Sequence, residues 1–369
     1  MTALDKRFLF CDHRISVPVR AGRPRRVRRR VREGKKTLEY QQKIENLPRS
    51  RPARILVGDI GATHSRLAVY SFRAGRVELL RHEVYASSEH ACLTEVLASF
   101  LEGEREDVEA ACLGLPAPIH SGITLPLTNL PWRVDREEVL RAVGTDRVVL
   151  INDVEASAAG IPGLSPDNLL CLQPGHADPD GNRVVISIGT GLGVSALTPT
   201  GRTFATEAGH GSFSPSRDPD FELHKSLQLE YGHVSWERVA SGSALPRIHA
   251  LFATERPSSL EGPEIVRRSL TDPACRQAVE TFRRYIGTAV GNFALTLMAS
   301  GGLYIRGGAA TKVLDKESAE QFLEAFRDKG RMRPLLETVP VFVVTESDLA
   351  LRGAARTAIA LLDSRWNQP

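Results

Sequence analysis

Apolar residues along the chain from Ile55 onward fall into short runs whose spacing changes from run to run. In "ILVGDIGATHSRLAVY" (55–70), two apolar runs flank a compact polar turn, a pattern typical of two strands joined by a tight hairpin. "RVELLRHEVYA" predicts a further strand, "HACLTEVLASFLEG" has helical spacing, and "VEAACLGLPAPI" predicts a strand that ends in a proline turn. Short strands and helices that alternate in this way predict an α/β fold.

The next two units place polar residues at the end of a buried strand. "DREEVLRAVG" predicts a short helix, with Asp135 and Glu138 as a capping box and Gly144 as its stop. It leads into "RVVLINDVEASAAG", a predicted buried strand whose carboxyl end carries Asn152 and Asp153.

The opening hairpin pattern occurs a second time in "NRVVISIGTGLGVSALTPTGRTFATEAGHGSF", where Thr190 lies between Gly189 and Gly191. Two hairpins that each hold a threonine in a glycine turn indicate an internally duplicated protein. Residues 276–300 predict a long helix, and "GGLYIRGGAATKVL" predicts a strand between glycine pairs. We expect the last helix, "DLALRGAARTAIALLD", to pack against the first lobe.

Length and composition narrow the class of protein. A chain of 369 residues with 42% hydrophobic and 25% charged residues is long enough for two lobes. No apolar stretch approaches the roughly 20 residues of a membrane span, so we expect no membrane partner. Five widely spaced cysteines without a CxxC pair argue against a structural zinc site and a disulfide scaffold, so we expect a cytoplasmic protein.

Basic residues are concentrated at the N-terminus. Residues 1–54 hold 17 Lys and Arg against 5 Asp and Glu, a charge of about +12, and the rest of the chain carries about −8. The segment has little apolar periodicity, so we expect a disordered, solvated extension. An arginine run can also bind nucleic acid or an acidic surface, and we expect nucleic acid as a partner only by way of this segment.

The two glycine turns and one acidic residue suggest a polyphosphate site. Backbone N–H groups and threonine hydroxyls in such turns can reach phosphate oxygens where larger side chains would block the approach. Asp59, at the mouth of the first turn, can hold Mg²⁺ directly or through water. A single Gly-Thr-Gly is more often a simple turn; the pair together with Asp59 is stronger evidence.

Several motifs in order resemble the bacterial-type glucokinase family, hexokinase-like sugar kinases of the actin-like ATPase superfamily. "DIGATHSRLA" and "SIGTGLGVS" are similar to the family's two phosphate motifs, and "GGLYIRGGA" to its adenosine segment. "LPLTNLPW", "LINDVEA", "EAGHGSFSP" and "YGHVSWERVASG" resemble its sugar-binding and catalytic segments. The resemblance implies a two-lobed, ribonuclease H-like fold with a cleft between a small domain (55–163, completed by 350–366) and a large domain (164–349).

The resemblance also implies a role for each matching residue. Asp153 would be the general base that accepts the proton of the sugar hydroxyl, and Asp59 would hold Mg²⁺ through water. The expected sugar ligands are Asn129, Asn152, Glu207, His210 and Glu237. The expected contacts to ATP are Asp59, Gly61, Thr63, Gly189, Thr190, Gly191, Gly307 and Gly308.

The implied activity is ATP-dependent phosphorylation of glucose to glucose 6-phosphate, the entry step of glycolysis. A kinase for mannose, glucosamine or N-acetylmannosamine is an alternative, as is a non-catalytic sugar-sensing regulator of the same fold. A homodimer is an alternative to a monomer. Taken singly, the site residues also have structural interpretations, of which the main one makes Asp153 a helix cap.

Two residues of the first turn depart from the family's usual Gly-Gly-Thr-Asn. Ala62 adds a methyl group where the backbone approaches phosphate, which is unfavourable if its φ is positive. His64 puts a titratable ring in place of a short amide. We expect altered nucleotide affinity rather than loss of binding, because Asp59, Gly61 and Thr63 remain.

Overall fold

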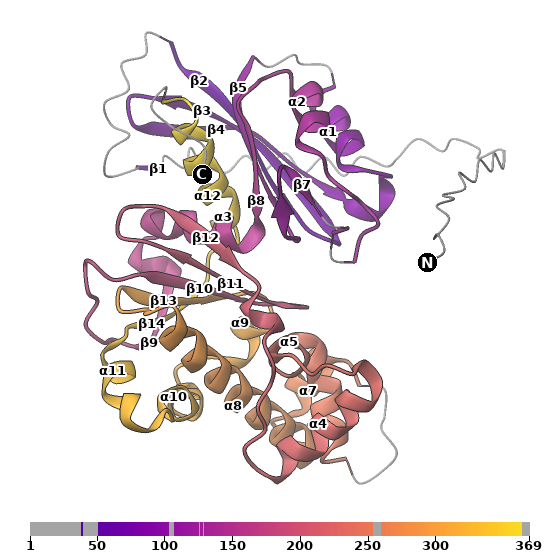
Figure 1. The fold of residues 1–369 in the computed structure, drawn as a ribbon, viewed down its shortest axis with the longest axis vertical. Coiled ribbons are helices and arrows are strands. Elements are labelled where there is room, and N and C mark those ends of the chain that lie inside the picture. Colours follow the sequence, from indigo (N-terminus) through magenta and orange to yellow (C-terminus); the bar gives the residue numbers. More distant parts are fainter. Residues whose placement is uncertain are drawn as a thin grey trace, which may run out of the picture. The chain divides into compact units, whose positions relative to one another are not determined.

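The computed structural model describes residues 38–39, 51–102, 107–124, 126–127, 129–253 and 260–363, and Figure 1 shows the path of the chain. Most of the basic extension, and the predictions made for it, lie outside the described residues. Within the part that is described, no helix combines the length and the apolarity that a membrane span requires.

The first sheet has six strands in the order β1-β4-β3-β2-β5-β8. The strands are β1 (Leu38–Glu39), β2 (Ala53–Ile60), β3 (His64–Arg73), β4 (Arg76–Ala86), β5 (Val108–Leu115) and β8 (Val148–Asn152). The predicted hairpin is confirmed, since β2 and β3 pair antiparallel, and β4 continues the meander. β5 and β8 run parallel to β2, so three strands end at the same edge of the sheet.

Alternating residues of β2 point into two separate cores. Leu56 and Ile60 pack with buried residues of α1 (Leu93–Leu101) and α2 (Arg136–Val143). Ile55 and Val57 pack on the opposite face with α12 (Leu349–Ala360), the last helix of the chain. The predicted packing of this helix is therefore confirmed, and Figure 1 shows it in yellow beside the indigo strands.

The second sheet repeats this plan in the order β12-β11-β10-β13-β14-β9. Its strands are β9 (Leu169–Gln173), β10 (Arg183–Ile188), β11 (Leu192–Leu197), β12 (Thr203–Thr206), β13 (Gly302–Arg306) and β14 (Val341–Val344). β10, β11 and β12 form an antiparallel meander, and β13 and β14 run parallel to β10. Because the first sheet has the same meander and the same two parallel strands, this topology fits the predicted duplication.

The long predicted helix is α8 (Pro273–Thr296), which begins three residues earlier than expected because the Asp272 side chain caps it. Its buried residues share one core with Val184, Ile186 and Ile188 of β10. The other helices of this part are α4 (Asp218–Tyr231), α5 (Trp236–Ala240), α6 (Leu245–Ala250), α7 (Gly262–Arg268), α9 (Ala310–Val313), α10 (Ala319–Arg327) and α11 (Arg333–Thr338).

The short helix α3 (Asp153–Gly160) contacts elements of both sheets. Val154 and Ala158 on this helix belong to one apolar cluster with Val185 of β10 and Leu197 of β11. The domain boundaries expected at 163/164 and at 349/350 stay predictions. What the contacts establish is that the helix beginning at Asp153 bridges the two sheets.

Two short strands lie between β5 and α2, namely β6 (Ile119–His120) and β7 (Ile123–Thr124). The predicted cap and stop of α2 are present in modified form. The Asp135 side chain accepts a hydrogen bond from the N–H of Glu137, one residue before the Glu138 of the expected capping box. Gly144 ends the helix in the left-handed conformation, with a φ of 81°, which a residue with a side chain adopts only with strain.

Candidate functional site

Asp153 lies where β8 passes directly into α3. Asn152 caps this helix, because its side-chain oxygen accepts hydrogen bonds from the N–H groups of Val154 at 2.9 Å and Glu155 at 3.3 Å. The Asp153 carboxylate also accepts from the Val154 N–H, at 2.9 Å. Since Asn152 already serves as the N-cap, capping alone does not explain why the next residue is an aspartate.

The environment of Asp153 favours its protonated form. Burial raises the pKa of this carboxyl to about 6, and the negative charge of Asp59 acts in the same direction. The positive charge of Arg306 and the hydrogen bond from Val154 oppose these effects in part. A carboxylate with a pKa near neutrality is suited to accept and release a proton at physiological pH.

Asp59 comes to the same edge of the first sheet from β2. It pairs in register with Gly114 of β5, the strand that separates β2 from β8. A Cβ on Gly114 would lie 3.2 Å from the Ala156 Cβ and 3.4 Å from the Asp153 Cα, so the missing side chain lets α3 approach the sheet. Arg66 Nη1 lies 3.4 Å from the Asp59 carboxylate. The ends of the two strands that flank β5 thus bring two carboxylates to the same edge, as parallel strand ends commonly do at ligand sites.

The first predicted phosphate turn joins β2 to β3, and hydrogen bonds from Ser87 hold its shape. The Gly61 N–H donates to the His64 carbonyl oxygen at 2.9 Å, and Ser87 Oγ donates to the Gly61 carbonyl oxygen at 2.7 Å. The Ser87 N–H also donates to the Thr63 carbonyl oxygen, at 3.0 Å. Ala62 does not have a positive φ, so its methyl group brings no backbone strain to the turn.

The second predicted phosphate turn joins β10 to β11 and is held by Glu237. The Gly189 N–H donates to the Gly191 carbonyl oxygen at 3.0 Å, and the exposed Thr190 forms the tip. Glu237, on α5, accepts a hydrogen bond from the Leu192 N–H at 3.0 Å. A Cβ on Gly191 would lie 2.6 Å from Glu237 Oε2. The structure therefore places this predicted sugar ligand directly against the turn.

The predicted nucleotide segment reaches the same turn through backbone contacts. Gly307 has a φ of 102°, and a Cβ there would overlap the backbone of Ile188, the last residue of β10. The Gly242 N–H donates to the Gly189 carbonyl oxygen at 2.8 Å. Gly308 has open space where a Cβ would project. Glycines on three separate segments thus let backbone approach backbone around the second turn.

Three of the predicted sugar ligands, Glu207, His210 and Glu237, form one polar group. His210 Nε2 lies 3.7 Å from Glu207 Oε2, and their side chains are 60% and 51% exposed. Burial raises the pKa of Glu207, the neighbouring His210 opposes this shift, and the charge of Glu237 adds to it. Like charges gathered on an accessible surface raise one another's proton affinity, which is common where a polar ligand binds.

Asn129 is a predicted sugar ligand for which the described part of the chain shows no contact with this group. It lies in the turn before Leu130 with a φ of 60°, a left-handed conformation that asparagine tolerates better than most residues. Within the described ranges, no hydrogen bond joins its side chain to Asp153 or to Glu207.

Two side chains near Asp153 were not predicted from the sequence. Arg306, the last residue of β13, donates a hydrogen bond to the hydroxyl of Ser157 on α3. The only local signal was the place of Arg306 immediately before Gly307 and Gly308. Ser157 resembles any small helix residue in the sequence, and nothing in the pattern distinguishes it.

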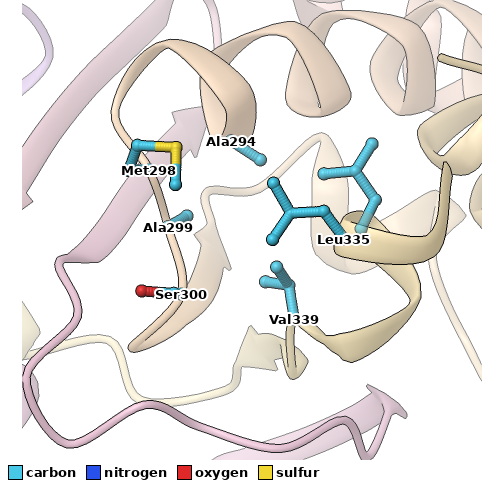
Figure 2. Close-up of a pocket in the computed structure, with 7 residues that line it drawn as sticks. Ala294, Met298, Ala299, Ser300, Leu335 and Val339 are labelled. Carbon is cyan, nitrogen blue, oxygen red and sulfur yellow. The ribbon is translucent and has the colours of Figure 1, made fainter. Parts of the chain in front are cut away.

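The described part of the chain holds no cluster of three or more His, Cys, Asp or Glu side chains that could bind a metal ion. Figure 2 shows a small apolar hollow near the end of α8, which none of the predicted site residues line. Its lining residues are Ala294, Met298, Ala299, Ser300, Leu335, Leu336 and Val339.

Comparison with known proteins gives concordant matches over most of the chain. A glucokinase from Marinobacter nauticus is 36% identical over 309 residues, which are 81% of this chain and 95% of the relative. The crystal structure of a glucokinase from an Antarctic psychrotroph matches with a TM-score of 0.70 and 29% identity, over 83% of this chain and 98% of that one.

A third match is a ROK family glucokinase from Streptomyces griseus, solved in complex with glucose and AMPPNP. It has a TM-score of 0.58 and 21% identity over 83% of this chain and 99% of that one, and it supports the actin-like ATPase fold. A sequence model of the glucokinase family matches residues 56–360. The chain therefore belongs to the glucokinase family.

Proposed function

We propose that this chain transfers the γ-phosphoryl group of ATP to the 6-hydroxyl of glucose, with Asp153 as the general base. The observation that carries the proposal is the buried Asp153 carboxylate, with its pKa raised to about 6, at the strand end beside Asp59. Phosphoryl transfer requires chiefly positioning, charge stabilisation and one carboxylate near the nucleophile. Asp153 accepts the proton of the attacking hydroxyl, which leaves the oxygen free to bond to phosphorus.

We assign sugar binding to the amides and charged side chains around Asp153. A neutral polyhydroxylated ligand needs several hydrogen-bond acceptors and donors. Carboxylates supply acceptors, and amides supply both acceptors and donors. The mutual proximity of Glu207, His210 and Glu237 supports this role for the three of them. The complete set that we propose is Asn129, Asn152, Glu207, His210 and Glu237.

We assign the triphosphate of ATP to the two glycine turns. The N–H groups of Gly61 and Gly189 close the two turns, so the donors that we assign to phosphate are the backbone N–H groups of Thr63, Thr190 and Gly191, with Gly61 and Gly189 keeping bulky side chains out of the approach. The open space at Gly308 suits the adenosine end of the nucleotide. The presence of AMPPNP, an ATP analogue, in the Streptomyces griseus glucokinase is consistent with ATP as the donor.

The donor set at Asp59 fits a magnesium ion that keeps most of its water. Mg²⁺ is commonly bound by one or two carboxylates together with waters and substrate phosphates, so no protein cage of three ligands is required. The Asp59 side chain is 17% exposed and lies close enough to Asp153 for their charges to repel. We propose that Asp59 holds Mg²⁺ through water, where the ion would neutralise phosphate charge during transfer.

We further propose a cytoplasmic location. Cys92, Cys112, Cys171 and Cys275 are all free thiols, as expected for a reducing compartment.

The test is ADP release measured with and without glucose, followed by a panel of hexoses. Glucose-dependent ADP release, with glucose the substrate of highest kcat/KM, supports the proposal. A higher kcat/KM for mannose, glucosamine or N-acetylmannosamine would assign a different substrate to the same chemistry. Tight glucose binding without ADP release under any condition would instead indicate a sugar-sensing regulator.

A further inference from the structure

Arg306 connects the second sheet to the helix that begins with Asp153. It ends β13, pairs in register with Ser187 of β10, and donates a hydrogen bond from Nη1 to the Ser157 hydroxyl. Ser157 is fully buried, and its hydroxyl donates in turn to the carbonyl oxygen of Asp153 at 2.9 Å. A guanidinium group, a hydroxyl and a backbone carbonyl thus form one continuous relay into the first turn of α3.

The surroundings of this relay leave little freedom for α3 to shift. A Cβ on Gly193 of β11 would lie 2.5 Å from a Val154 methyl carbon, so strand and helix are already in close contact. Val154 also belongs to the apolar cluster that joins α3 to β10 and β11. Arg306 adds a directional polar contact to this apolar one, and directional contacts fix orientation better than apolar burial does.

Arg306 also supplies a positive charge next to Asp153. The charged groups that act on Asp153 are Asp59 from β2 and Arg306 from β13. On α3 itself, Glu155 accepts a hydrogen bond from Thr203 of β12 at 2.9 Å. On α12, Arg352 forms an ion pair with Glu346 at 2.8 Å.

We propose that Arg306 is a positioning residue for phosphoryl transfer, which acts through Ser157 to hold Asp153 in place and sets a positive charge beside its carboxylate. The proposal rests on the proposed function, in which Asp153 is the general base. Because Gly307 follows directly and approaches the second phosphate turn, the residue that orients the base is continuous with the segment assigned to the nucleotide.

Three variants separate the two parts of this role. Arg306→Gln removes the charge and weakens the relay, Arg306→Lys keeps the charge but loses the planar guanidinium, and Ser157→Ala breaks the relay but keeps the charge. Arg183→Gln is the matched control, because Arg183 lies at the opposite end of β10, in register with Gly302. Each is measured for kcat, for KM of glucose and of ATP, and for the pH profile of kcat/KM.

We expect Arg306→Gln to lower kcat about tenfold and to move the acid limb of the pH profile upward by about half a unit to one unit. Ser157→Ala lowers kcat without moving the acid limb. Arg306→Lys has the acid limb at the position of the unchanged protein, but its kcat is still lower than that of the unchanged protein. In all three the KM for ATP stays within about threefold of the unchanged protein. Arg183→Gln leaves kcat and the limb unchanged.

A merely structural role would lower the melting temperature of Arg306→Gln and leave the limb in place, and this outcome overturns the proposal. An equal loss of kcat in Arg183→Gln also overturns it. If Arg306→Gln does not fold, Arg306→Lys and Ser157→Ala decide the question: a kcat and an acid limb like those of the unchanged protein in both variants overturn the proposal. Asp153→Asn is measured in parallel. If Asp153→Asn keeps turnover, the assignment of the base fails. If Asp153→Asn loses turnover but the Arg306 variants behave as wild type, this inference alone fails.

Discussion

The Glu237 carboxylate accepts a hydrogen bond from the backbone N–H of Leu192 at 3.0 Å, which ties α5 to the turn between β10 and β11. Leu192 is 4% exposed, so its N–H has little access to water as an alternative partner. Glu237 is thus part of the support of the second predicted phosphate turn.

This contact predicts different results for two changes at one position. Glu237→Ala leaves the Leu192 N–H without an acceptor, at a cost of about 1–3 kcal/mol, so we expect the KM for ATP to rise at least about fivefold. Glu237→Gln retains an acceptor and should leave the KM for ATP nearly unchanged. If Gln raises the KM for glucose, Glu237 also binds the sugar through its charge. Steady-state kinetics with each substrate varied in turn provides the test.

The raised pKa of Asp153 predicts an acid limb in the activity profile. Below about pH 6 the carboxyl takes up a proton and can no longer accept one from the sugar hydroxyl, so kcat/KM for glucose should fall about tenfold per pH unit. Glu207→Gln is the control, because Glu207 also has a raised pKa and its removal should leave the limb in place. A limb near the ordinary value for aspartate, about 4, would contradict the assignment.

Asp153→Asn should remove turnover without destabilising the protein. Loss of a general base typically lowers the rate about 10²–10⁴-fold. We expect ATP affinity nearly unchanged and sugar binding weakened only moderately. Asp135→Asn is the matched control, because Asp135 caps α2 away from the site and asparagine caps about as well as aspartate. Near-wild-type kcat in Asp153→Asn would remove Asp153 from the mechanism.

The same variant tests the cost of the buried charge. The native pKa of about 6 lies above the unfolded value of about 4, so the native carboxyl loses stability as pH rises between these values. A neutral asparagine avoids this loss, which is on the order of 2–3 kcal/mol for two pKa units. We expect Asp153→Asn to unfold at higher denaturant than the unchanged protein at about pH 8 and at the same concentration near pH 4. A lower midpoint at the higher pH would contradict this account.

A second buried aspartate has the opposite pH dependence. Asp220 is 1% exposed; it accepts hydrogen bonds from Arg284 at 2.5 and 3.1 Å and from the Tyr285 hydroxyl at 2.9 Å. Burial alone would raise its pKa, but these hydrogen bonds and the charge of Arg284 lower it overall. Breaking a buried pair commonly costs about 3–5 kcal/mol, so we expect Asp220→Asn to approach this loss at neutral pH.

Because the native pKa of Asp220 is lowered, its stabilisation is complete above the unfolded value of about 4 and is lost as pH falls through the native pKa. The difference between Asp220→Asn and the unchanged protein should therefore shrink in acid. Urea unfolding at several pH values measures it. A difference that is constant with pH would assign the loss to packing rather than to the charge.

The start of β2 predicts where the N-terminal segment becomes dispensable. Ala53 is fully buried and pairs with Phe72, so the core begins two residues before Ile55. A chain that starts at Arg51 loses, of the described strands, only β1, which pairs with two residues of β4, and should keep glucose-dependent ADP release, whereas one that starts at Ile55 should have a lower melting temperature. If the chain starting at Arg51 precipitates or loses activity while the full chain works, the basic extension is part of the fold.

Local patterns were sufficient for the two hairpins, for β4, β5, β8 and β13, and for the place of Asp153, whereas β9 and β14 were not predicted. Alternating apolar residues and glycine turns determine these features over a few residues, and the repeated hairpin predicted an internal duplication that the topology of the two sheets fits. Gly144 and Asp135 acted at the helix ends as expected, although Asp135 is bonded to Glu137 instead of forming the predicted capping box with Glu138. These interactions all lie within one turn of the chain.

The contacts that organise the site could not be predicted because they join distant positions. Glu237 lies 45 residues from Leu192, and Arg306 lies 149 residues from Ser157. No periodicity encodes such a pairing, which depends on how strands and helices come together. The conformation of Ala62 was open for the same reason, since the turn is set in part by Ser87.

The packing of α12 against β2 has a consequence for how the chain folds during synthesis. Ile55 and Val57 are among the first residues of the first sheet to leave the ribosome, and Ala354 and Ala358, which share their core, are among the last described residues to do so. The second sheet and its helices lie wholly between these two segments and can form while one face of the first sheet is still uncovered. One face of the first strands to be made is thus the last to be buried, and a stop codon shortly before Leu349 would leave a permanent apolar surface on an otherwise assembled protein.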